Sequence, residues 1–106
     1  MRVLWKVIQE KIGDFQILRN SLMNIIIKQI ALMDRIDQLI RLEATGPPGE
    51  LASRLNMSRA SLFNIINLMK ALNAPIEYDP AIRSYTYSKT VAFKFGFYEK
   101  DLPDPN

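Results

Sequence analysis

The sequence contains no histidine and no cysteine. These residue types supply the usual zinc ligands, the thiol nucleophile and the commonest general base, so most enzymatic mechanisms lack their reactive groups here. Three carboxylates, Asp34, Asp37 and Glu43, lie on a helical pattern rich in arginine, which favours a solvated charged face over a catalytic pair. The sequence therefore predicts no catalytic residue, no metal site and no cofactor.

Long uncharged apolar runs are also missing. Lys28 follows the run 25–27, and Lys6, Glu10 and Lys11 interrupt the apolar residues near the start, so neither a membrane span nor a secretory signal is predicted. The 106 residues suit one small domain, and 48% hydrophobic with 24% charged residues is typical of a chain that folds. The formal charge of +3 favours a polyanionic partner, and we expect a cytoplasmic protein.

Three segments differ in character. Residues 1–22 predict an amphipathic N-terminal helix weakened by glycine, residues 23–98 predict the domain, and residues 99–106 predict a disordered tail. The N-terminal helix either packs on the domain or pairs with a second copy. Alternatively, translation starts at Met23 and residues 1–22 are an unselected leader. The apolar positions of the N-terminal pattern are Trp5, Ile8, Ile12, Phe15 and Leu18.

Three helices are predicted inside the domain. The first runs from Ile26 to near Glu43, where glycine and proline end it. The second starts at Pro48, because proline tolerates the first helical turn, and cannot pass Asn56. The third covers residues 58–72, with serine at position 58 as its N-cap.

Two short strands follow, with apolar residues at every second position. Residues 76–78 and 85–87 alternate in this way around a turn at 79–81, where Asp and Pro favour the change of direction. A third extended segment over 91–97 predicts a sheet of three antiparallel strands. We expect the aromatic stripe to form the sheet side of the core. Its members are Tyr78, Tyr85, Tyr87, Phe93, Phe95 and Phe97.

The second and third helices have the spacing of a helix-turn-helix. The predicted buried positions are Leu51, Ala52, Leu55, Met57, Leu62 and Ile65. The small Ala52 allows two steeply crossed helices to approach, and Asn56 tolerates the left-handed backbone that the turn requires.

In the segments RIDQLIRLEATG, ELASRLNMSRASLFNIINLMKALNAPIEYD and SYTY, the chain resembles the winged helix-turn-helix domains of bacterial transcription regulators, notably the DeoR-like and biotin-repressor-like kind. The resemblance covers roughly residues 26–97. It implies an α+β fold of three helices with a small antiparallel sheet, the wing, and a nucleoid-associated regulator that binds double-stranded DNA. Two positions depart from the pattern: Pro47 replaces a common Ser or Thr cap, and Ala60 replaces a common basic residue.

The third helix is then the recognition helix in the major groove. Its outward face carries amides that can pair with adenine and an arginine that can pair with guanine, although the same amides also suit an ordinary surface. The predicted base-contacting residues are Arg59, Ala60, Phe63, Asn64 and Asn67. The predicted contacts to the DNA backbone come from Ser58, Ser61, Arg54, Lys70 and Arg83, of which Ser58 is first a cap.

Other interpretations remain open. A winged helix with a near-neutral outer face also suits a protein-interaction module without DNA binding, and RNA binding ranks third. A homodimer is possible through the N-terminal helix or through the C-terminal strand near Phe97 and Tyr98. Phe63 either meets a thymine methyl or packs against the wing.

Overall fold

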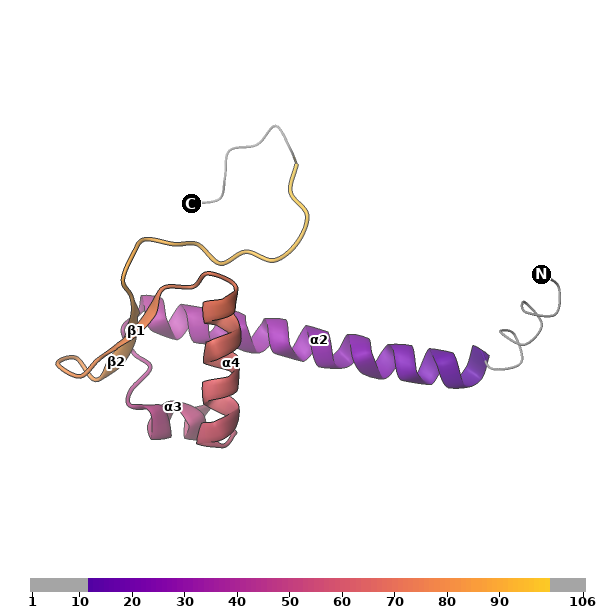
Figure 1. Cartoon of the computed structure of the whole chain (residues 1–106), viewed down its shortest axis with the longest axis horizontal. Helices are drawn as coiled ribbons and strands as arrows, with labels where there is room; N and C mark the ends of the chain where they lie inside the picture. Colours follow the sequence, from indigo (N-terminus) through magenta and orange to yellow (C-terminus); the bar gives the residue numbers. More distant parts are fainter. Residues whose placement is uncertain (1–11, 100–106) are drawn as a thin grey trace. The chain divides into compact units, whose positions relative to one another are not determined.

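The computed structural model describes residues 12–99, which form an α+β arrangement of helices followed by a hairpin (Figure 1). Its contacts divide the chain into two compact units, Met1–Ile30 and Ala31–Asn106. Three helices and two antiparallel strands are present among these residues. They are α2 (Ile12–Arg41), α3 (Pro48–Arg54), α4 (Arg59–Ala71), β1 (Ile76–Asp79) and β2 (Ser84–Tyr87).

Helix α2 is longer than the sequence predicted. It runs without interruption from Ile12 to Arg41, so the predicted start of the first domain helix at Ile26 is wrong. No proline or glycine interrupts residues 14–41, and nothing in that stretch therefore stops the helix. It ends two residues before the predicted Glu43, which adopts a positive φ of 53°. The N-terminal positions Trp5 and Ile8, and residues 100–106 of the predicted tail, lie outside the described residues.

The connection between α3 and α4 follows the predicted chemistry. Helix α3 begins at Pro48, and the preceding Pro47 provides no side-chain cap. Asn56 has a φ of 56°, which confirms the predicted left-handed residue in the turn. Helix α4 is capped by Ser58, whose hydroxyl accepts a hydrogen bond from the Ser61 backbone N–H at 3.1 Å. Figure 1 shows the two helices crossing steeply.

The core of the second unit is built by one face from each helix and by the hairpin. Ala52 is 3% exposed, in agreement with its predicted place where α3 and α4 approach. Met57, in contrast, is only half-buried although its position predicted burial. The buried apolar side chains are Met33, Ile36, Ile40, Leu51, Ala52, Leu55, Leu62, Ile65, Ile66, Met69, Ile76 and Tyr85.

The two strands pair in the register that joins Ile76 to Tyr87 and Asp79 to Ser84. The Asp79 carboxylate accepts a hydrogen bond from the Ala81 N–H at 2.9 Å, which closes the predicted turn. Among the described residues, no third strand forms, so the predicted three-stranded sheet is wrong. Alternation shows that a segment can present one apolar face, but it does not supply a sheet edge to pair with.

The predicted aromatic stripe is buried or half-buried on the two strands but largely exposed beyond them. Tyr85 is buried and contacts Tyr78 edge to face, with ring centroids 5.1 Å apart. Phe95 and Phe97 are exposed, and Phe93 is half-buried, so the prediction that the whole stripe lies in the core is wrong. The reason is the missing third strand, because these side chains have no sheet to hold them against the helices.

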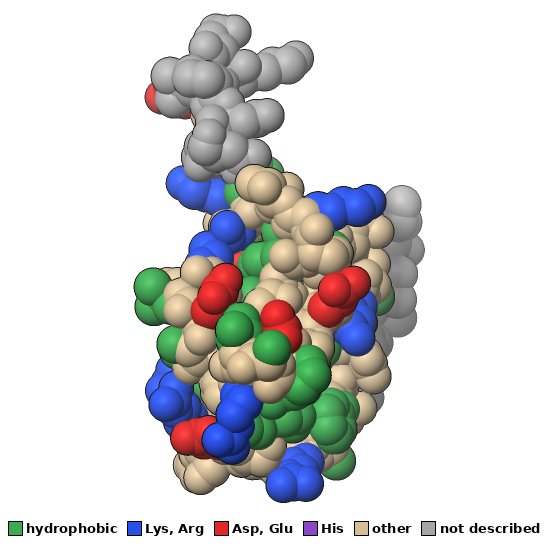
Figure 2. Space-filling view, turned by 90° about the vertical axis from the view of Figure 1, so that its left-hand side faces the viewer, with side chains coloured by type: hydrophobic (Ala, Val, Ile, Leu, Met, Phe, Trp, Pro, Cys, Tyr) green, Lys and Arg blue, Asp and Glu red, His purple; other side chains and the backbone are tan. Residues whose placement is uncertain are grey.

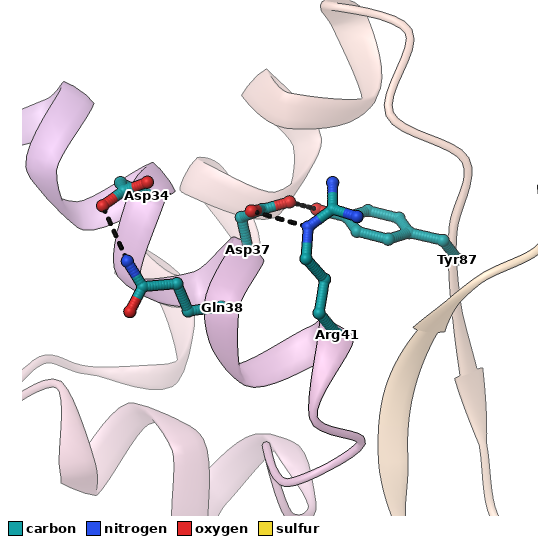
Figure 3. Close-up of polar contacts among 5 residues, drawn as sticks. All are labelled: Asp34, Asp37, Gln38, Arg41 and Tyr87. Atoms are coloured by element: carbon teal, nitrogen blue, oxygen red, sulfur yellow. Dashed lines mark hydrogen bonds and ion pairs between the residues drawn. The ribbon is translucent and has the colours of Figure 1, made fainter. Parts of the chain in front are cut away.

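A second correction concerns Asp37, which the arginine-rich pattern placed on a solvated face. Its side chain is buried and accepts two hydrogen bonds, from the Tyr87 hydroxyl at 2.6 Å and from Arg41 Nε at 2.9 Å (Figure 3). The Arg41 guanidinium also lies 5.3 Å from the centre of the Tyr87 ring. Asp34 is exposed, as predicted, and accepts a bond from Gln38. Asp37 therefore anchors β2 to the end of α2.

The loop between α2 and α3 is joined to β2 by a buried hydroxyl pair. Thr45 Oγ1 accepts a hydrogen bond from the Tyr85 N–H at 2.8 Å, and Ser84 Oγ accepts one from the Thr45 N–H at 3.2 Å. Both side chains are completely buried. The pair holds the start of β2 against the loop that leads into α3.

Replacing Thr45 with valine should lower the free energy of unfolding by about 1–3 kcal/mol, because the buried Tyr85 N–H loses its acceptor while the shape is kept. Urea denaturation followed by circular dichroism measures this loss. The control is Thr45→Ser, which keeps the hydroxyl and should cost less. Equal losses in both variants would mean that the methyl group matters and the hydrogen bond does not.

Candidate nucleic-acid interface

Helix α4 has two chemically different faces. Four apolar side chains, Leu62, Ile65, Ile66 and Met69, are buried against the core. At 100° per residue, the centre of the opposite face falls on Ala60, Asn64, Asn67 and Ala71, and all four are exposed. The outward face is therefore small and amide-bearing, with no bulky side chain at its centre.

The charge distribution on α4 is one-sided. The helix contains no Asp or Glu, and its two charged residues, Arg59 and Lys70, are both basic and exposed. A solvated surface helix usually mixes charges of both signs, because pairs four residues apart stabilise it. A carboxylate-free face instead allows close approach of a polyanion.

Arg59 does not extend freely into solvent. Its guanidinium lies against Gly49 in the first turn of α3, where a methyl group on Gly49 would come within 2.9 Å of Arg59 Nε. Glycine therefore provides the space in which the arginine lies between the two helices. Residue spacing alone does not predict this contact, although a glycine in the first turn of a helix is a visible signal in the sequence.

The two serines at the start of α4 bind each other. Ser58 donates its hydroxyl to Ser61 Oγ at 3.0 Å and accepts from the Ser61 N–H. The Ser58 hydroxyl is thus occupied by capping, whereas the proton of the Ser61 hydroxyl points to no acceptor within this pair. Of the two predicted phosphate donors, Ser61 is the better placed.

Arg54 and Arg83, which are also predicted to contact the DNA backbone, differ in what their side chains do in the fold. Arg54 donates from Nη1 to the Ala44 carbonyl at 2.7 Å, so it supports the loop between α2 and α3. Arg83 directly precedes β2 and adopts a φ of 52° in the hairpin turn. Both remain exposed, but only Arg83 lies at the tip of the hairpin.

Apolar side chains flank the amide face on both sides. Phe63 is 44% exposed beside Arg59 and Lys70, and Leu68 and Leu72 are exposed on the other side. Seen from the hairpin side, Figure 2 shows lysine and arginine spread over the surface, with acidic groups among them and an apolar patch between the cations. The face thus combines amides, cations and a small apolar border.

Residues 12–99 carry few features of other kinds of functional site. No group of three or more potential metal ligands gathers there. None of the helices in this range has the length and apolar character needed to cross a bilayer. A pocket of about 300 Å³ lies between the ends of α2 and α4 and the segment 91–93, with Met33, Met69 and Phe93 among its lining residues.

Comparison of the chain with protein-family models, with curated proteins and with solved structures finds no match. The geometry of α4 and its neighbours is therefore the basis for assigning a function.

Proposed function

We propose that the protein is a small transcription regulator of the winged helix-turn-helix class, which binds double-stranded DNA with α4 in the major groove. The observation that carries the proposal is the outward face of α4, which presents Asn64 and Asn67 without any carboxylate. An asparagine amide pairs bidentately with adenine, and Asn64 and Asn67 lie three residues apart on the same exposed helix face. The proposed function requires no cofactor, metal ion or catalytic residue.

The roles of the side chains follow from their positions. Asn64 and Asn67 read base edges, Ala60 permits close approach, and Phe63 meets a thymine methyl. Arg59 approaches the DNA from its position against Gly49, between α3 and α4.

Contacts to phosphate come from the edges of the same surface. Ser61 and Lys70 lie at the two ends of α4, and Arg83 extends from the hairpin turn. Arg54 belongs to the fold rather than to the interface, because its guanidinium supports the loop at Ala44.

The proposal is tested by fluorescence anisotropy of labelled duplexes at several salt concentrations. With the two cationic phosphate contacts Lys70 and Arg83, the logarithm of affinity should fall with the logarithm of salt at a slope of roughly −2 for each chain bound. The variant Arg83→Asn removes one cation while keeping a residue that tolerates positive φ, and it should reduce the slope by about one. Binding that does not change with salt would overturn the proposal.

The variant Gly49→Ala tests directly whether the position of the Arg59 guanidinium against Gly49 matters for DNA binding. The added methyl displaces the guanidinium rather than backbone, so the free energy of unfolding should stay equal or rise by up to about 1 kcal/mol, since alanine favours helix. Affinity for DNA should nevertheless fall, in the same direction as for Arg59→Ala. In the double variant the second change should add little, because both remove one contact. Full additivity would show that Gly49 and Arg59 act separately.

A second function is favoured by the exposed Leu68 and Leu72, which border the amide face on one side. These side chains suit a protein-docking surface, since aliphatic groups beside a polar rim are typical of such interfaces. The double variant Leu68→Ser with Leu72→Ser distinguishes the two functions. DNA affinity should persist if the amide face binds DNA, whereas a docking module would lose its partner.

A further inference from the structure

The pocket between α2, α4 and the segment 91–93 lies entirely within the second unit. Its volume is about 300 Å³, and the buried Met33 and Met69 lie on its inner side. Leu72 and Ala92, which also line it, are exposed, so the pocket opens to solvent on their side. This volume lies at the lower end of the range of small-molecule sites. The pocket is therefore large enough to hold a small ligand.

Most of the pocket wall is apolar. Seven of its ten lining residues are apolar, among them Met33, Met69 and the half-buried Phe93. Methionine sulfur and an aromatic ring both make favourable contacts with another aromatic ring. No lysine or arginine is among the ten lining residues, so an anionic group would be desolvated there without a cation beside it. The wall therefore favours a neutral aromatic ligand.

The polar part of the pocket consists of hydrogen-bond acceptors. Asp37 and Tyr87 both line it, and the Tyr87 hydroxyl already donates its only proton to Asp37 at 2.6 Å (Figure 3). The carboxylate and the phenol oxygen each keep lone pairs, so they can only accept from a ligand. Arg41 Nε, 2.9 Å from Asp37 Oδ2, compensates the charge, and a neutral donor is therefore sufficient. Asn73, the third polar lining residue, is exposed, so water can satisfy its amide.

We propose that this pocket binds a small neutral aromatic molecule that carries one N–H or O–H donor. The ring contacts the two methionines and Phe93, and the donor binds Asp37 or the Tyr87 oxygen. A molecule with acceptors alone would place its lone pairs against those of the pocket. The bound ring also holds the segment 91–93, which pairs with no strand, against α2 and α4. The inference does not depend on DNA binding.

Indole is the probe, and quinoline is its matched control. Both are flat bicyclic rings of similar size, but the indole nitrogen donates a hydrogen bond whereas the quinoline nitrogen only accepts. Amide chemical shifts of the full chain, titrated without DNA, measure the binding. Indole should cause saturable shifts at the lining residues and bind about tenfold more tightly than quinoline, because only indole can donate to the acceptors.

The variant Ala74→Leu tests the location of the site. Ala74 lines the pocket, and its backbone is fixed because its N–H donates to the Met69 carbonyl at 3.0 Å and its carbonyl accepts from the Ile76 N–H at 2.9 Å. The larger side chain should compete with indole for the same volume and weaken its binding by about tenfold or more. Ala81→Leu adds the same side chain in the exposed hairpin turn and should leave indole binding unchanged. Thermal unfolding of both variants shows that they are folded.

Nuclear Overhauser contacts in the wild type test the site independently of any variant. Indole protons should contact the methyl groups of Met33 and Met69. Shifts that do not saturate, or that are confined to the exposed Phe95 and Phe97, would overturn the inference. Equal affinities for indole and quinoline would overturn the requirement for a donor. A folded Ala74→Leu variant that binds indole as the wild type does would overturn the location.

Discussion

Replacing Tyr87 with phenylalanine should lower the free energy of unfolding by about 1.5–3 kcal/mol. The substitution removes the hydroxyl that donates to Asp37 at 2.6 Å and leaves a carboxylate that is only 4% exposed with one partner fewer. The phenylalanine ring keeps the apolar contacts and most of the attraction to the Arg41 guanidinium, so the loss reports the hydrogen bond.

Urea denaturation measures this loss, and Tyr78→Phe is the matched control. Tyr78 is half-buried on the other strand, and its hydroxyl makes no hydrogen bond to any of the described residues 12–99, so the loss in Tyr78→Phe should stay within about 0.5 kcal/mol. Similar losses for both tyrosines would contradict the account, because they would show that Asp37 does not depend on Tyr87.

The same bond predicts how stability changes at alkaline pH. Burial, together with the hydrogen bond to Asp37, raises the pKa of Tyr87 above its ordinary value. The unfolded chain then loses this proton at lower pH than the folded chain, so stability is fully present below about pH 10 and declines as pH rises above it. Burial also raises the pKa of Tyr85. Tyr87→Phe should therefore weaken the alkaline decline without abolishing it.

Replacing Asn64 with alanine should cost about 1–3 kcal/mol of discrimination at one base pair of the bound site, which is roughly a tenfold to hundredfold loss of preference. The physical reason is the exposed position of Asn64 at the centre of the outward face of α4, where its amide can pair with an adenine edge. Stability should change by no more than about 0.5 kcal/mol, because the side chain is exposed.

The measurement is selection of bound duplexes from a random pool, followed by anisotropy on the selected site and on its single-base variants. Asn24→Ala is the matched control, since it removes an exposed amide from a helix outside α4. The control should keep the full preference of the wild type. A uniform loss of affinity over all sequences in Asn64→Ala would assign the residue to phosphate contact rather than to base reading.

Local signals in the sequence located most of the elements around α4. Pro48 at the start of α3, Asn56 in the turn and Ser58 as the cap each have a backbone preference that does not depend on distant contacts. The turn after β1 was predictable for the same reason, because the Asp79 side chain binds the backbone two residues later.

Features that depend on distant partners were not predictable from the sequence. The alternation of apolar and polar residues over 91–97 predicted a strand. Whether a strand forms there depends on a free sheet edge in the right position and register to pair with, which the residue spacing does not show. Asp37 was placed on a solvated face because its partner Tyr87 is fifty residues away in the chain. The contact of Arg59 with Gly49 was missed for a similar reason, since it joins two helices across the turn.

The most direct test of the account is a map of the DNA-bound surface by amide chemical shifts of the full chain, titrated with a selected duplex. If α4 binds the major groove, the largest changes should occur over residues 58–71 and around Arg83, with small changes over residues 16–30. Changes confined to residues 16–30, or no saturable change at any residue, would contradict the central claim that α4 presents its amide face to DNA.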